Sequence, residues 1–166
     1  GNAGVGKATA VDLARRGARV ILACRNKARG ESAVWDIRQK SGNSEVILMI
    51  LDLANLNSVR AFAETFLKSE PRLDILINNA GAVRTEIGYS SRSWLFRMVW
   101  FLAVFKRDCD TGAQTSIYCA TEEGIESLSG QYFADCQPKM PCPQARDDQL
   151  AKKLWEFSER LLGLTT

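Results

Sequence analysis

Residues 1–8, GNAGVGKA, place three glycines directly before a segment with helical apolar spacing, residues 5–16, which Gly17 follows. Glycine just past the last periodic residue commonly ends a helix. A glycine-rich turn that opens a helix is typical of phosphate-binding sites, because the first backbone N–H groups of the helix point at the anion. The opening stretch therefore predicts a phosphate-binding turn followed by a helix.

One interpretation of this turn is the P-loop, G-x-x-x-x-G-K-[ST]. Gly1, Gly6 and Lys7 fit that pattern, and Asp52 follows an apolar run where a magnesium-holding aspartate would stand. Ala8, however, occupies the position of the hydroxyl that binds magnesium. The P-loop pattern thus lacks an atom that its chemistry needs.

The second interpretation is the glycine turn of a dinucleotide-binding fold, in which Gly4 and Gly6 let the backbone approach a pyrophosphate. In such folds the second strand ends in an acid that favours NAD or in an arginine that favours NADP. Here the apolar run 19–24 ends before Arg25. We favour this interpretation over the P-loop, while a turn that only packs a helix on a strand remains a third alternative.

Apolar runs alternate with helical patterns along the first half of the chain. The runs are residues 19–24, 46–51 and 73–77, and helices are predicted at 27–40 and from a Ser58 cap onward. Strands that are apolar throughout are typical of parallel sheets covered on both faces. This alternation predicts an α/β domain with a parallel sheet.

The regular alternation ends after Gly81. Residues 82–93 are polar, and residues 94–105 are almost wholly apolar but too short to span a bilayer. We expect a helix at 111–121, a short strand at 131–133 and an amphipathic helix at 147–162. For 94–105 the alternatives are a core helix and a segment that covers a lipophilic substrate or touches a membrane surface.

Composition excludes several classes of function. The chain has 166 residues, which fits one domain, and a net charge of +3, too small to indicate nucleic-acid binding. It has no histidine, so Ser–His–Asp and Cys–His mechanisms and imidazole zinc sites are excluded. Five cysteines without a Cys-x-x-Cys pair favour thiols in a reducing, intracellular compartment over a disulfide framework or a metal site.

Several motifs occur in the order found in one enzyme family. They are GNAGVGK (1–7), LACRN (22–26), LDLA (51–54) and NNAG (78–81), followed by 112–120, 128–133 and 145–156. Together they resemble the classical short-chain dehydrogenase/reductases, most of all the retinol-dehydrogenase-like branch. The resemblance implies a Rossmann-like doubly wound parallel sheet, here incomplete because the first strand and the central catalytic segment are absent.

The resemblance also implies an NADP(H) cofactor. It assigns cofactor-binding positions to Gly4, Gly6, Arg25, Asp52, Leu53, Asn78 and Ala80. Arg25 matches the residue that favours NADP(H), Asp52 and Leu53 match the pair beside the adenine, and Asn78 with Ala80 matches the strand end beside the ribose. From the residues alone, Arg25 is equally an exposed charge at a strand end, and Asp52 equally caps the next turn.

The family reaction interconverts an alcohol, here a retinol-like or other lipophilic one, and its carbonyl. It uses a serine and a tyrosine whose phenol is tuned by a lysine four residues later, because an unperturbed phenol is a poor base at neutral pH. The residues four positions after Tyr89, Tyr118 and Tyr132 are Ser93, Glu122 and Cys136. No catalytic residue is therefore assigned, and we expect the chain to be inactive; the alternative is a non-catalytic module that binds a nucleotide or a partner.

The missing catalytic segment is expected at Gly81. Residues 78–81 resemble the end of the family's fourth strand, whereas residues 81–86 resemble a segment that follows its sixth. At about 30 residues per strand–helix–strand unit, the loss is at least ~60 residues. We therefore treat 1–166 as one partial domain with a junction at residue 81, in which the strand 73–77 has lost its neighbours. An N-terminal segment, including any membrane anchor, is likewise expected to be missing.

Overall fold

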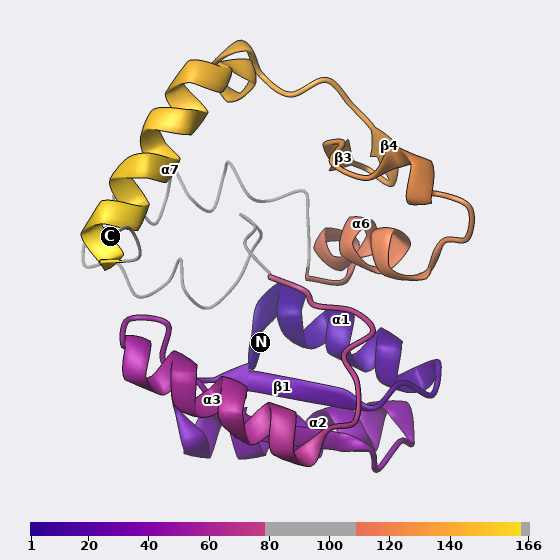
Figure 1. Cartoon of the computed structure of the whole chain (residues 1–166). Coiled ribbons are helices and arrows are strands. Elements are labelled where there is room, and N and C mark those ends of the chain that lie inside the picture. The colour runs from indigo at the N-terminus through magenta and orange to yellow at the C-terminus, as the bar shows by residue number, and fades with distance from the viewer. Residues whose placement is uncertain (79–108, 164–166) are drawn as a thin grey trace, which may run out of the picture. The chain divides into compact units, whose positions relative to one another are not determined.

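The computed structural model of the chain describes residues 1–78 and 109–163 (Figure 1). They belong to two compact units, Gly1–Glu123 and Gly124–Thr166. Ala80 and the apolar segment 94–105 lie outside the described residues.

The described residues of the first unit form two strands and four helices. These are α1 (Gly4–Arg15), β1 (Val20–Cys24), α2 (Lys27–Ser41), β2 (Val46–Ile50), α3 (Leu56–Ser69) and α6 (Cys109–Thr121). β1 and β2 pair in parallel, with Val20 opposite Val46 and Cys24 opposite Ile50. The predicted α/β class with parallel strands is confirmed, and the sheet of the described residues is incomplete.

Local sequence signals set the ends of these helices. α2 begins after Asn26, whose Oδ1 accepts a hydrogen bond from the Arg29 N–H at 2.9 Å, and it ends at Gly42 with φ of +73°. A positive φ is a conformation that glycine adopts at little cost, so Gly42 is a natural stop.

The cap of α3 is not the predicted one. Asn55 caps the helix, because its Oδ1 accepts hydrogen bonds from the N–H groups of Asn57 and Ser58. Ser58 lies in the first turn and uses its Oγ to accept a hydrogen bond from the Asp52 N–H at 3.0 Å. Asn55 and Ser58 are both residue types that commonly cap helices. Which of them caps α3 depends on where the preceding turn lies.

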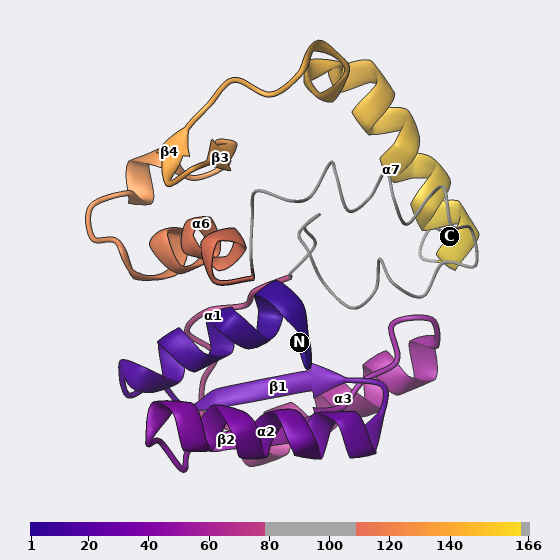
Figure 2. The ribbon, with the colours of Figure 1, turned by 180° about the vertical axis from the view of Figure 1, so that it is seen from behind.

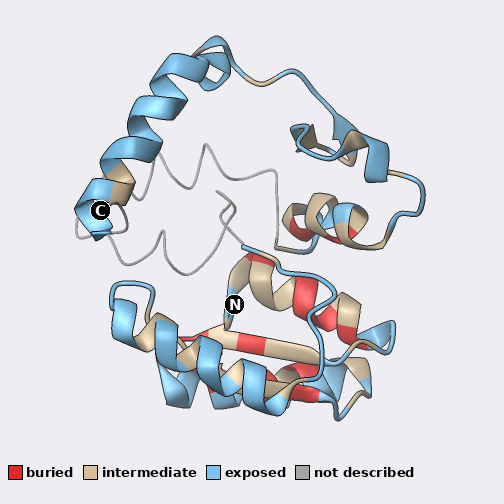
Figure 3. Cartoon of the chain, in the orientation of Figure 1, coloured by how far each residue is buried: buried red, intermediate tan, exposed pale blue. Residues whose placement is uncertain are grey.

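The main core lies between the sheet and the pair α1 and α2 (Figure 3). Its buried members are Ala10, Val11, Ala14, Leu22, Ala33, Val34, Ile37 and Val46. α3 covers the opposite face of the sheet (Figures 1 and 2), but it contributes no buried residue. The described sheet is therefore firmly packed on one face only.

Gly30 is the point of closest contact between α2 and the sheet. A Cβ atom built on Gly30 would lie 2.5 Å from Leu48 Cδ1 and 2.7 Å from Cys24 Sγ. Both distances are shorter than van der Waals contact, so a side chain at position 30 would push α2 away from both strands.

The predicted strand at 73–77 is wrong. Residues 73–77 have no regular secondary structure, and Leu73 and Leu76 are 57% and 69% exposed. A strand exists only when its backbone N–H and C=O groups have a ladder partner. Within the described residues β1 pairs only with β2, so this apolar segment has no neighbouring strand.

α6 packs on α1 through a small second cluster. Val5 of α1 is buried together with Ala113 and Ile117 of α6, and Ala8 packs against them. The predicted helix at 111–121 is thus confirmed, beginning two residues earlier. Its small side chains let the two helices approach closely.

The second unit contains a short hairpin and a long helix. Its elements are η1 (Glu126–Leu128), β3 (Phe133–Ala134), β4 (Gln137–Pro138), η2 (Pro143–Arg146) and α7 (Asp148–Leu162). The strand predicted at 131–133 begins only at Phe133, where it enters an antiparallel pair with β4.

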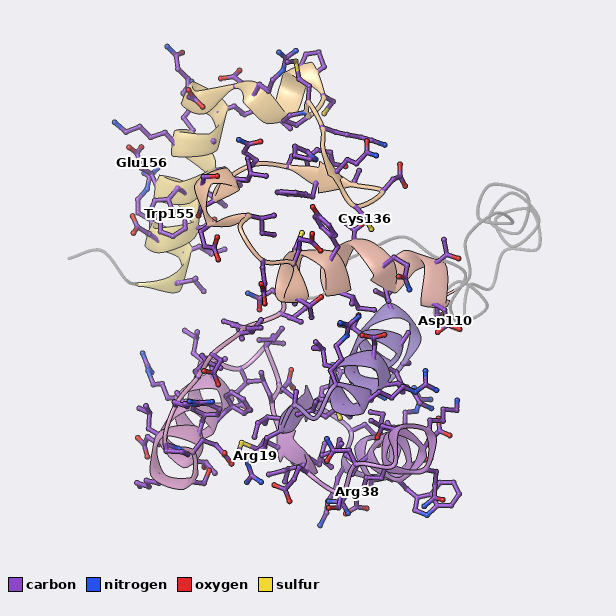
Figure 4. The ribbon with its side chains drawn as sticks, turned by 90° about the vertical axis from the view of Figure 1, so that its right-hand side faces the viewer. Arg19, Arg38, Asp110, Cys136, Trp155 and Glu156 are labelled. Carbon is purple, nitrogen blue, oxygen red and sulfur yellow. The ribbon has the colours of Figure 1, made fainter. Side chains whose placement is uncertain are left out.

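α7 confirms the predicted amphipathic helix. Asp147 caps it by accepting a hydrogen bond from the Leu150 N–H at 2.9 Å, and Gly163 ends it with φ of +64°. Its large apolar side chains are exposed, among them Leu154 and Trp155 (Figure 4). None of the helices in the described ranges is long and apolar enough to cross a membrane.

Arg19 joins three elements at the amino ends of the strands (Figure 4). Its guanidinium donates to both carboxylate oxygens of Glu70, at 2.8 and 3.0 Å, and also to Glu45. The Glu70 side chain is only 6% exposed. The hydrogen bonds from Arg19 lower the pKa of Glu70 below its ordinary value of 4.5.

The close packing at Gly30 gives the first prediction. Gly30→Val should lower the free energy of unfolding by about 1–3 kcal/mol, because the new side chain overpacks the contact with Leu48 and Cys24. Urea unfolding followed by circular dichroism measures the change. Ser32→Val, at an exposed position of the same helix, is the matched control and should change stability little. Equal stability of the two variants would contradict the packing seen at Gly30.

The ion pair of Glu70 gives a pH-dependent prediction. Because the folded-state pKa is lowered, the stabilisation is present above about pH 4.5 and is lost as the pH falls through the folded-state pKa. Glu70→Gln should therefore have a lower urea midpoint than the unmodified chain at pH 7, and the difference should shrink below pH 4.5. Glu64→Gln, which removes an exposed carboxylate 3.9 Å from Lys68, should show a smaller effect at pH 7.

Candidate functional site

The carboxyl ends of β1 and β2 lie at the same edge of the sheet because the strands are parallel. The Leu51 N–H donates to the Cys24 carbonyl oxygen at 3.0 Å and holds the two chain exits together. Arg25 directly follows β1, and Asp52 follows β2 by two residues. In open α/β sheets this edge is where ligands bind.

The glycine turn reaches the same edge. A Cβ atom built on Gly1 would lie 3.0 Å from Leu22 Cδ1 and 3.4 Å from the Ala23 carbonyl oxygen, so the turn approaches the last part of β1. The fold thus brings the glycine turn, Arg25 and Asp52 together from three separate places in the sequence.

The start of α1 is open to an anion. Gly4 is its first residue and has φ of +58°, a value that favours glycine. The preceding residue, Ala3, has no side-chain oxygen to cap the helix, and the first turn contains no acid. The first backbone N–H groups of α1 are therefore without a side-chain acceptor from the cap, as in helix termini that bind phosphate.

The Lys7 side chain forms an ion pair with α2 and takes no part in the glycine turn. Its Nζ lies 2.5 Å from Asp36 Oδ2 on α2, and Lys40 approaches the same oxygen at 3.1 Å. Hydrogen bonds from Lys7 and Lys40 lower the pKa of Asp36, which keeps the carboxylate charged. A P-loop needs its lysine on the phosphates. The P-loop interpretation therefore lacks the lysine as well as the hydroxyl at position 8.

Arg25 lies at this edge and carries a positive charge. It is exposed, and its guanidinium makes no hydrogen bond or ion pair within the described parts of the chain. Lys27 and Arg29 add two further cations to the first turn of α2, which contains no acid. Cations at a helix N-terminus are electrostatically unfavourable, and a bound anion relieves that repulsion.

Asp52 shapes the turn before α3. Its Oδ1 accepts a hydrogen bond from the Ala54 N–H at 3.0 Å, and its backbone N–H donates to Ser58 Oγ. The capping role suggested by the sequence is therefore present. Leu53, the next residue, is 79% exposed at the edge of the sheet.

Two predicted positions are less well defined. Asn78 is exposed at the end of an irregular segment, because the strand expected to hold it does not form. Ala80 lies outside the described residues, as does Tyr89. Tyr118 lies on α6 and Tyr132 is 52% exposed in the second unit.

The sequence analysis did not identify Asn26, Gly30 or Cys24 as parts of the site. Asn26 fits the rule that asparagine before a helical pattern is a cap, so it was recognisable. An isolated glycine inside a helical pattern is a weaker signal of close packing. Nothing in the local sequence indicates the contact that Cys24 makes with the Asn26 carbonyl.

Comparisons with known proteins agree with the motifs. The sequence pattern of the short chain dehydrogenase family matches residues 1–94. A human protein, dehydrogenase/reductase SDR family member 13, is 36% identical, and the match covers 98% of this chain and 71% of the relative. Bovine retinol dehydrogenase 12 is 30% identical over 98% of this chain and 84% of the relative.

The alignment with the human protein also shows a deficit in this chain. It runs over 269 residues, although the chain has only 166. The surplus consists of residues of the relative that have no counterpart here.

Solved structures resemble only part of the chain. Menthone neomenthol reductase from Mentha piperita is 36% identical with a TM-score of 0.45, over 48% of this chain and 28% of that protein. An NADPH-bound short chain oxidoreductase from Pseudomonas aeruginosa is 33% identical with a TM-score of 0.45, over 51% and 33% of the two chains. This chain thus spans about a third or less of either protein.

The family pattern matches more than half of the chain, and the matches cover most of the length of the two relatives. Both findings agree with the parallel strands and the glycine turn. The chain belongs to the short-chain dehydrogenase/reductase family and has retinol-dehydrogenase-like homologues.

Proposed function

We propose that this chain binds NADP(H) at the carboxyl edge of β1 and β2 and does not itself catalyse hydride transfer. The observation that carries the proposal is Arg25, whose exposed guanidinium has no partner in the described residues and lies at the same edge as the glycine turn. An unpaired cation beside an uncapped helix start fits the negative charges of a dinucleotide.

The residues fit the parts of the cofactor as follows. The backbone at Gly4 and Gly6 lies against the pyrophosphate, where side chains would prevent close approach. Asp52 and Leu53 would lie beside the adenine and Asn78 beside the ribose, and the same role for Ala80, which is outside the described residues, stays a prediction. When bound, NADP(H) is the carrier of the hydride in the family's reaction. The residues of this chain bind and orient the cofactor.

Preference for the 2′-phosphate follows from the charges after β1. Arg25 can donate two parallel hydrogen bonds to a phosphate, and Lys27 and Arg29 add positive charge nearby. A carboxylate at position 25 would instead accept from a ribose 2′-hydroxyl and repel a phosphate. The sequence Arg25-Asn26-Lys27 therefore supports NADP(H) over NAD(H).

The reaction of the family is the reversible oxidation of an alcohol to a carbonyl, and the name of the bovine relative, retinol dehydrogenase 12, supports a lipophilic alcohol such as retinol as the substrate class. That reaction needs a group that moves a proton at the substrate oxygen. The chain has no Tyr-x-x-x-Lys and no histidine to supply it. Binding without turnover is therefore the function that its own residues support.

The catalytic segment is proposed to be missing between Gly81 and Ala82. The surplus of aligned residues in the human relative supports a large internal loss. The irregular segment at 73–77 supports the same conclusion, because an apolar strand with its neighbours deleted has nothing to pair with. The contact of residues 94–105 with a lipophilic substrate or a membrane surface stays a prediction.

A substitution at position 25 tests the cofactor assignment. Hydrogen bonds to a charged group contribute about 1.5–3 kcal/mol, so Arg25→Asp should reverse a preference for NADP⁺ over NAD⁺. Isothermal titration calorimetry of the full chain measures both dissociation constants. Arg160→Asp makes the same charge change on α7 and should leave the ratio of the two constants unchanged. Equal affinities of the unmodified chain for NADP⁺ and NAD⁺ would refute the role of Arg25.

An activity assay tests the absence of turnover. The purified chain should oxidise no NADPH in the presence of retinal or simple aldehydes above a buffer control, because general acid–base catalysis typically contributes about 10²–10⁴-fold. Inserting the corresponding segment of the human relative between Gly81 and Ala82 should restore NADPH oxidation. Turnover by the unmodified chain, proportional to its concentration, would show that the catalytic groups lie elsewhere.

A further inference from the structure

Cys24 is a buried thiol at the centre of the turn that carries Arg25. It is the last residue of β1 and is 7% exposed. Its Sγ donates a hydrogen bond to the carbonyl oxygen of Asn26 at 3.3 Å. The same oxygen accepts the first backbone hydrogen bond of α2, from the Gly30 N–H at 2.9 Å. The hydrogen bond between the Cys24 side chain and the Asn26 carbonyl therefore closes a loop around Arg25, the residue between them.

The thiol itself is fixed by its surroundings. A Cβ atom built on Gly30 would lie 2.7 Å from Sγ, so α2 lies directly against the sulfur. The backbone carbonyl of Cys24 is held in addition by the Leu51 N–H. The sulfur has one acceptor within reach and little room to take another rotamer.

Both neighbours of Arg25 are therefore anchored, one to the sheet and one to the helix. Asn26 is held on its side chain by the Arg29 N–H and on its carbonyl by Cys24 and Gly30. The Arg25 side chain makes no hydrogen bond or ion pair with the described residues. The bond between Cys24 and Asn26 is therefore one of the contacts that shape the turn from which Arg25 leaves the backbone.

We propose that Cys24 is a positioning residue for recognition of the cofactor 2′-phosphate, acting through the Asn26 carbonyl on Arg25. This inference rests on the proposed function, because it concerns the same NADP(H) site. Loss of the thiol donor leaves the Asn26 carbonyl with the Gly30 N–H as its remaining donor, which loosens the turn and lets Arg25 turn away from the phosphate. Gly4 and Gly6, the residues proposed for the pyrophosphate, make no hydrogen bond with Cys24 within the described residues, so their contribution to binding is expected to remain.

Three substitutions separate the donor from the packing. Cys24→Ala removes the donor and part of the volume, Cys24→Val removes the donor and adds one carbon, and Cys24→Ser keeps a donor. Cys142→Ala changes an exposed cysteine of the second unit and is the control. Comparing valine with serine keeps the test meaningful if the alanine variant does not fold.

Calorimetry of the full chain with NADP⁺ and with NAD⁺ gives the readout. In the alanine and valine variants, affinity for NADP⁺ should fall about threefold to tenfold, the range expected for one hydrogen bond, while affinity for NAD⁺ stays the same. The serine variant should retain most of the preference. A purely structural role would lower the urea midpoint without changing the ratio of the two affinities, and that result would overturn the proposal.

The outcomes distinguish this inference from the function on which it rests. If the unmodified chain prefers NADP⁺ and the alanine and valine variants keep that preference, only the role of Cys24 is refuted. If the unmodified chain binds neither dinucleotide, or both equally, the proposed function itself is refuted and the role of Cys24 with it.

Discussion

The parallel hydrogen-bond ladder between β1 and β2 is the interaction on which the described fold depends. It sets the register from Val20 opposite Val46 to Cys24 opposite Ile50. Because the strands run in the same direction, their exits lie at one edge and bring Arg25 and Asp52 to the same place. The contact between Gly30 and the pair Cys24 and Leu48 then fixes α2 against this ladder. The core thus packs against the paired strands, and the candidate site lies at their carboxyl ends.

The two faces of this two-stranded sheet are covered unequally. α1 and α2 bury six residues against one face of the sheet, whereas α3 on the other face buries none. A buried backbone polar group without a partner costs about 1–3 kcal/mol, compared with a total stability of about 5–15 kcal/mol for a typical domain. The apolar residues 73–77 avoid that cost by remaining exposed and irregular. Their composition is that of a strand, but no strand lies beside them among the described residues.

The charges of the first unit are divided between structure and binding. Arg19 is used by Glu45 and Glu70, and Lys7 is used by Asp36, so these cations hold elements together. Arg25 has no such partner among the described residues, although it lies close to the start of a helix. Binding sites retain groups that the fold leaves unsatisfied, because a ligand must supply the missing interaction. The side chains of Arg29 and Arg60 likewise have no partner among the described residues, but only Arg25 directly follows β1.

The sequence by itself determined the local features: the helices at 27–40 and 147–162, the two paired strands, and the glycine turn with Arg25 that led to the family. These follow from backbone preferences and apolar spacing within a few residues. Only the tertiary structure decided that 73–77 is no strand, that Asn55 and not Ser58 caps α3, and that Lys7 pairs with Asp36. It alone also placed Cys24 under Gly30. Each of these depends on a partner elsewhere in the chain or on how the preceding turn is placed, and a local pattern contains no information about that.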